Sequence, residues 1–187
     1  MYHAIVLLIR RQKELTLKKN IIFLLCYMFM AGCASTKITT IIYSGSFKLD
    51  LPTNNLAKAK ILSIDGPSIK FSNNSTISGL IITKELESLP LSFNLHDYPS
   101  YSLGLKSTKK LPEIFQNKFL RSSDEIKKTY KPPQVFTDIN NGKDIYIACN
   151  NDSCIEFIVN KDIADQILMI TTSGFTQKQL IELTKGI

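Results

Sequence analysis

Residues 144–159, with the sequence DIYIACNNDSCIEFIV, decide the fold of this chain. Two apolar runs flank the segment Asn150–Ser153, whose Asn, Asp and Ser residues favour tight turns, so we expect a β-hairpin. The runs match in length when Cys149 lies directly opposite Cys154. Directly opposed residues of antiparallel strands lie about 4.5 to 5.5 Å apart at Cα, and a disulfide tolerates roughly 4.4 to 6.8 Å. The register therefore allows the two cysteines to bond.

The predicted pairing also gives the hairpin two apolar faces. Ile147 lies opposite Glu156 on the face of the cysteines, and Ala148 lies opposite Ile155 on the other face. Residues 166–171 (QILMIT) have the same two-sided apolar character. We therefore expect these three strands to lie centrally in a sheet that is covered on both sides.

Further strands are predicted nearer the N-terminus. Phe47, Leu49 and Leu51 alternate with polar residues, which is the period-2 pattern of a half-buried strand, and Pro52 stops it. The other candidate strands are separated by turn-rich stretches, which predicts a meander, and they span residues 60–64, 68–71 and 76–83.

Helices are predicted in the middle and at the end of the chain. Residues 112–120 begin with a proline that suits a first helical turn, and residues 122–130 begin with the capping-box pair Ser122 and Glu125. Residues 89–110, which Pro and Gly interrupt, are interpreted as a long packed loop with a short strand.

A second capping-box pair, Thr176 and Gln179, begins a C-terminal helix with an apolar stripe. Together the elements predict an α+β fold, an antiparallel β-sheet with helices packed on it, for which a three-layer α/β/α sandwich is one arrangement.

The first 33 residues have the organisation of an export signal. The apolar run at residues 21–31 is about eleven residues long, whereas a membrane-spanning helix needs roughly 20 and a signal core roughly 7 to 15. Lys18 and Lys19 precede this run, and small residues follow it. Met30-Ala31-Gly32-Cys33 resembles the lipobox of bacterial lipoproteins, which implies cleavage before Cys33 and acyl chains on its sulfur.

The resemblance to lipoproteins sets the expected organisation and location of the chain. Residues 1–32 are the signal peptide, of which 1–16 are interpreted as lying upstream of the true start; residues 33–45 are the lipidated cysteine and tether, and 46–187 form one domain. Ala34 after the cysteine directs a lipoprotein to the outer membrane under the enteric sorting rule. A plain secretory signal and an uncleaved anchor are the alternatives.

Cysteine usage agrees with export. Cys26 leaves with the signal and Cys33 takes lipid, so Cys149 and Cys154 remain as an even pair in a compartment where disulfides form. We therefore predict that these two cysteines bond to each other.

The net charge of +7 does not indicate a nucleic-acid partner. Residues 1–32 hold five basic groups and one acidic group, which leaves 18 basic and 15 acidic groups in the remainder. Most of the excess charge belongs to the export segment, and no basic run is interleaved with aromatic residues.

No catalytic constellation is evident, and we expect no cofactor and no metal. His96 is the only histidine after Cys33, and it is interpreted as a solvated loop residue. Asp97, Ser100 and Ser102 are close to it in sequence, but the members of a catalytic triad must converge in space. Glu156 has two interpretations, an ion pair with a Lys at the sheet edge or a polar contact in a binding surface.

The mature chain resembles the PsbP-like family in two segments, Ser46-Phe47-Lys48-Leu49-Asp50-Leu51-Pro52 and the stretch from Asp144 to Ile187. The resemblance implies an α/β/α sandwich, which is also found in bacterial lipoproteins.

The sequence therefore predicts a non-enzymatic, lipid-anchored binding or adaptor protein with a protein partner. An immunity lipoprotein that neutralises a toxin delivered to the periplasm, and an envelope hydrolase, are the alternatives. The residues expected to contact the partner are Asn150, Asn151, Asp152, Ser153 and Glu156.

Overall fold

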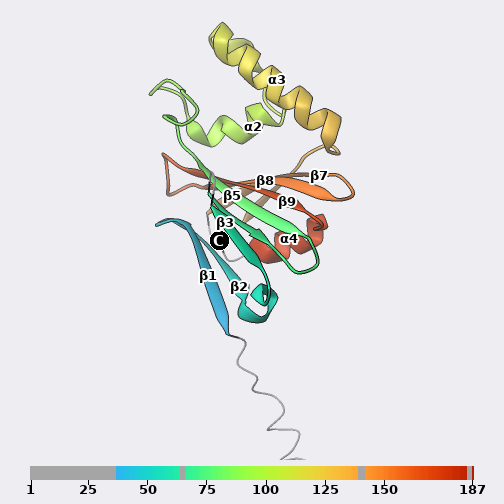
Figure 1. Cartoon of the computed structure of the whole chain (residues 1–187). Coiled ribbons are helices and arrows are strands. Elements are labelled where there is room, and N and C mark those ends of the chain that lie inside the picture. Colours follow the sequence, from blue (N-terminus) through green and yellow to red (C-terminus); the bar gives the residue numbers. More distant parts are fainter. Residues whose placement is uncertain (1–36, 64–65, 139–141, 185–186) are drawn as a thin grey trace, which may run out of the picture. The chain divides into compact units, whose positions relative to one another are not determined.

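An antiparallel seven-stranded sheet organises the computed structural model, which describes residues 37–63, 66–138, 142–184 and 187 (Figure 1). The predicted signal peptide and Cys33 lie outside the described residues. The strand order is β3-β4-β5-β9-β8-β7-β6. The strand bounds are β3 Lys60–Ser63, β4 Pro67–Lys70, β5 Thr76–Ile82, β6 Gln134–Asp138, β7 Lys143–Cys149, β8 Ser153–Asn160 and β9 Ile167–Ser173.

The register predicted for the central hairpin is confirmed. Cys149 pairs with Cys154, Ile147 with Glu156 and Ala148 with Ile155 in the ladder between β7 and β8. Strand β9 pairs with β8 on one side and β5 on the other, so these strands lie inside the sheet. The predicted meander of β3, β4 and β5 is also present.

Layers cover both faces of the sheet, so the predicted α+β fold with helices on a sheet is confirmed (Figure 1). One face carries α2 (Tyr98–Ser102) and α3 (Glu113–Thr129). The opposite face carries the hairpin of β1 (Ile38–Ser44) and β2 (Phe47–Pro52) together with α4 (Gln177–Thr184). No helix in the described ranges has the length and apolar character needed to cross a membrane.

The predicted tether, residues 33–45, is partly folded, because strand β1 lies within it. Its β-branched Thr and Ile residues favour a strand, and β1 pairs with β2 in a separate two-stranded sheet. The Tyr43 ring lies on the seven-stranded sheet at Gly79, where any Cβ would collide with it. Strand β1 therefore belongs to the compact unit Ile38–Ile187.

The segment predicted as a loop with a short strand is helical in three places. It forms the 3-10 turn η2 (Leu95–Asp97), α2 and the 3-10 turn η3 (Thr108–Lys110). Four aromatic rings explain why it packs so firmly, since they contact one another in stacked, tilted and edge-on arrangements at centroid distances of 5.3 to 5.9 Å; they are Phe93, Tyr98, Tyr101 and Phe119.

The two helices predicted on either side of Arg121 are a single helix, α3. The expected capping box at Ser122 does not form, because Ser122 lies inside α3, where backbone amides bond along the helix; Glu125 instead pairs with Arg121 one turn earlier at 3.4 Å. Phe119 and Ile126 are both buried on the side that faces the sheet, so packing favours a continuous helix over a break.

One strand was missed, and the cap of the last helix was predicted correctly. Strand β6 was not predicted, because its residues are mostly exposed and show no alternation. The capping box of α4 is confirmed: the Thr176 amide donates to Gln179 Oε1 at 2.9 Å, and the Gln179 amide donates to Thr176 Oγ1 at 3.3 Å.

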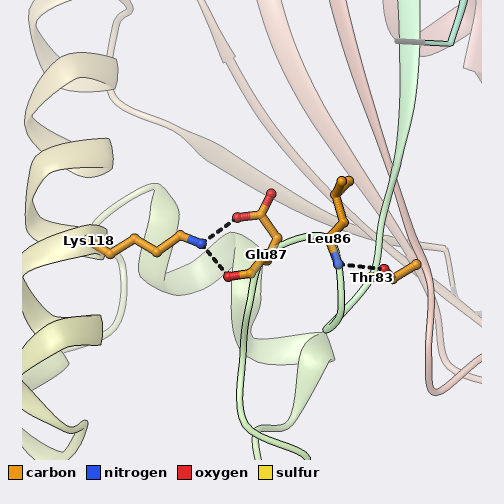
Figure 2. Close-up of polar contacts among 4 residues, drawn as sticks. All are labelled: Thr83, Leu86, Glu87 and Lys118. Carbon is orange, nitrogen blue, oxygen red and sulfur yellow. Dashed lines mark hydrogen bonds and ion pairs between the residues drawn. The ribbon is translucent and has the colours of Figure 1, made fainter.

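The loop between β5 and α2 is fixed to α3 (Figure 2). Lys118 Nζ donates to the Glu87 carbonyl at 2.6 Å and lies 2.7 Å from the Glu87 carboxylate. Within the loop, the Leu86 amide donates to Thr83 Oγ1 at 3.1 Å. These contacts hold the N-terminal half of α3 in place over the sheet.

Candidate functional site

The disulfide closes the end of the central hairpin. Cys149 and Cys154 Sγ lie 2.00 Å apart, and their Cα atoms are 4.1 Å apart. The next pair toward the turn is hydrogen-bonded, with the Asn150 amide donating to the Ser153 carbonyl at 2.9 Å. Because hydrogen-bonded and non-hydrogen-bonded pairs alternate, the cysteines occupy a non-hydrogen-bonded pair, where opposed Cα atoms lie closest.

Reduction of this disulfide is expected to lower the free energy of unfolding by about 2 kcal/mol, because the closed loop is only six residues long. Urea unfolding of the oxidised protein and of the Cys149→Ala–Cys154→Ala variant measures the difference. Alkylation and intact-mass analysis of protein taken directly from cells should detect no free thiol at either position. Two alkylated thiols there would contradict the bond.

The tip of the hairpin, Asn150–Ser153, is held by one side chain. Asn150 Oδ1 accepts from the Asp152 amide at 2.8 Å, from the Ser153 amide at 2.7 Å and from Ser153 Oγ at 3.1 Å. Three donors on one carboxamide oxygen leave the turn little freedom. Sequence reasoning found these residues from their turn chemistry, but it could not find this network.

Neighbouring elements support the tip from two sides. Asn150 Nδ2 donates to the Thr129 carbonyl at the end of α3 at 3.1 Å. The Gly174 amide, after β9, donates to the Asp152 carbonyl at 2.6 Å. Asn151 and Asp152 are nevertheless exposed. The tip therefore presents two polar side chains on a backbone that is already ordered, which reduces the entropy that a partner must remove on binding.

Glu156 does not belong to this surface, contrary to both interpretations of the sequence. Its side chain is 0% exposed and lies beneath α4. Oε1 accepts from Thr184 Oγ1 at 3.0 Å, whereas Oε2 has no hydrogen-bond partner among the described residues. Burial raises the pKa of this carboxyl to about 8. The expected ion pair with a lysine is absent from the part of the chain that the structure describes.

His96 is part of the packing rather than a solvated loop residue. Its Nε2 lies 2.8 Å from the Ile163 carbonyl, which connects η2 to the segment between β8 and β9. The neighbouring Asp97 pairs with Lys106 at 2.7 Å. Ser102 is buried, and its Oγ has no partner among the described residues. Among the described residues, His96 and Asp97 thus have different partners, and no hydrogen bond joins either of them to Ser102.

Among the described residues, no group of three His, Cys, Asp or Glu side chains is arranged to hold a metal ion. Comparison of the chain with family models, with curated proteins and with solved structures finds no match.

Proposed function

We propose that the mature protein is a lipid-anchored, non-enzymatic binding or adaptor protein of the bacterial envelope that contacts a protein partner through the tip Asn150–Ser153. The observation that carries the proposal is the combination of rigidity and exposure at this tip. The disulfide and the Asn150 network fix its backbone, while Asn151 and Asp152 face the solvent.

Binding fits the chemistry of the tip better than catalysis does. The exposed groups are an amide and a carboxylate, which recognise a partner by hydrogen bonds and charge. A protein partner agrees with the exposed position of the tip at the end of a hairpin, since small ligands are usually held in concave sites. The lipobox resemblance of Met30–Cys33 places this recognition at the periplasmic face of a membrane, with the outer membrane as the expected location.

Replacing both exposed tip side chains, in Asn151→Ala–Asp152→Ala, is expected to weaken partner binding at least roughly ten-fold, which corresponds to about 1.4 kcal/mol. The backbone contacts of the tip remain, because Asn150 supplies the side-chain acceptor. The measurement is crosslinking in living cells followed by affinity purification of the tagged lipoprotein and quantitative mass spectrometry.

The matched control is Asn117→Ala–Asp124→Ala, which removes the same two side-chain types from exposed positions on α3. A partner that is retained by the control and lost by the tip variant supports the proposal. If no protein is enriched over an untagged strain, or if the tip variant captures its partner undiminished, the proposal is wrong. An envelope component as partner identifies an adaptor, and a toxin identifies an immunity protein.

A further inference from the structure

A groove with a volume of about 550 Å³ lies between α3 and the loop at residues 104–109. On the α3 side its wall follows one stripe of the helix, at positions 116, 120, 123 and 127. From position 116 to position 127 the helix rises by eleven steps of 1.5 Å, so this stripe is roughly 16 Å long. The side chains that decide its chemistry are Leu105, Lys106, Lys109, Gln116, Leu120 and Lys127.

The charged side chains that line the groove are all lysines. Three lysines line it, and no Asp or Glu does. Lys106 is paired with Asp97 at 2.7 Å. In the described ranges, Lys109 and Lys127 form no ion pair, so two ammonium groups from opposite walls are available to an anionic ligand.

Apolar side chains accompany these charges. Leu105 on the loop is 47% exposed and Leu120 on the helix is 49% exposed, and both line the groove. Each exposes apolar surface that the domain leaves uncovered. A complementary ligand therefore carries negative charges and apolar groups along the same roughly 16 Å.

The walls are held in position before any ligand arrives. Gly104 has a φ of +69°, and a Cβ at this position would lie 2.8 Å from Lys127 Nζ and 3.2 Å from Ser123 Cβ. Glycine thus lets the loop approach the helix closely. On the other side of α3, Phe119 stacks on Phe93 and Lys118 pairs with Glu87 (Figure 2), which fixes the helix.

We propose that this groove binds an extended peptide segment of a protein partner, about five residues long, in which acidic and apolar side chains alternate or adjoin. The length follows from a rise of roughly 3.3 Å per residue over the helical stripe. A peptide fits better than a bilayer, because a flat membrane surface does not follow a groove whose charges lie on both walls. The inference rests on the proposed function, since it gives the protein partner a second contact.

The test is selection of random seven-residue peptides on the tagged protein purified from membranes in detergent, followed by affinity measurement on the enriched peptides. We expect enrichment of Asp and Glu together with Leu, Ile or Phe. Lys109→Gln–Lys127→Gln is expected to weaken binding of these peptides roughly two- to thirty-fold, since each of the two exposed ion pairs contributes about 0.2 to 1 kcal/mol. Binding should also weaken as salt increases.

The matched control is Lys128→Gln–Lys178→Gln, which removes the same charge from exposed lysines outside the groove. Unchanged thermal unfolding of both variants shows that the fold is retained. No enrichment, enrichment without acidic residues, or equal binding to the groove variant and the control overturns the proposal. Vesicles of phosphatidylethanolamine and phosphatidylglycerol provide the other arm, in which lysine-dependent vesicle binding without acidic peptides reassigns the groove to lipid.

The groove and the tip can be tested independently of each other. The Asn151→Ala–Asp152→Ala variant should bind the selected peptides as tightly as the wild type, because the tip does not line the groove. If peptide binding fails while tip-dependent capture succeeds, only the groove is wrong. If peptides bind while capture ignores the tip, only the tip is wrong.

Discussion

Glu156→Gln is expected to stabilise the protein strongly at pH 8 to 9 and to leave its stability at pH 5 almost unchanged. Glu156 is 0% exposed, and one of its carboxylate oxygens has no partner among the described residues. Burial raises the pKa of this carboxyl to about 8 from its usual value of about 4.5. Glutamine has nearly the shape of the protonated acid and does not ionise.

The sign follows from proton binding. Between pH 4.5 and about 8 the folded protein holds a proton on Glu156 that the unfolded chain releases, so the free energy of unfolding falls as pH rises. This stability is fully present below pH 4.5 and is lost by the time the pH has passed about 8. At 1.36 kcal/mol for each unit of pKa difference, the total loss is roughly 4 to 5 kcal/mol.

Urea unfolding of wild type and Glu156→Gln at pH 5, 7 and 9 measures this difference. Glu113→Gln is the matched control, because Glu113 is exposed in the first turn of α3. The two curves of stability against pH should diverge as pH rises, with the control following the wild type. Parallel curves for wild type and Glu156→Gln would contradict the assignment of Glu156 as a buried neutral acid.

Cys33→Ser is expected to release the protein from membranes almost completely. The lipobox resemblance implies two or three acyl chains at Cys33, and each buried CH₂ contributes about 0.8 kcal/mol to membrane attachment. Serine has no thiol to form the thioether. Labelling with an alkyne analogue of palmitate and cell fractionation measure the lipid and the location.

Cys26→Ser is the matched control for this experiment. Cys26 lies in the apolar run at residues 21–31, which the predicted cleavage before Cys33 would remove, so the variant should be labelled and fractionated like the wild type. Equal labelling of Cys33→Ser and wild type would show that the chain is not a lipoprotein. Loss of label in both variants would show that the labelling does not report on Cys33.

Local sequence patterns are sufficient to predict part of this fold. The period-2 alternation of Phe47, Leu49 and Leu51 predicts a strand with one buried face, and all three are at most 1% exposed. The turn residues and cysteines set the register of β7 and β8 because few other pairings bury both strands. The same turn chemistry predicts the tip at Asn150–Ser153.

The surfaces that pack together depend on contacts between residues far apart in the sequence. Strand β1 lies against the seven-stranded sheet because Tyr43 packs at Gly79. Helix α3 is continuous because an aromatic cluster covers its buried face. The basic groove requires two segments brought together at Gly104.

Glu156 shows the physical reason most clearly. Its strand position was predicted correctly, but its burial depends on α4, which begins more than twenty residues later and closes over it through Thr184. A local pattern specifies the face on which a side chain lies, whereas the element that covers that face is specified by the sum of long-range packing contacts.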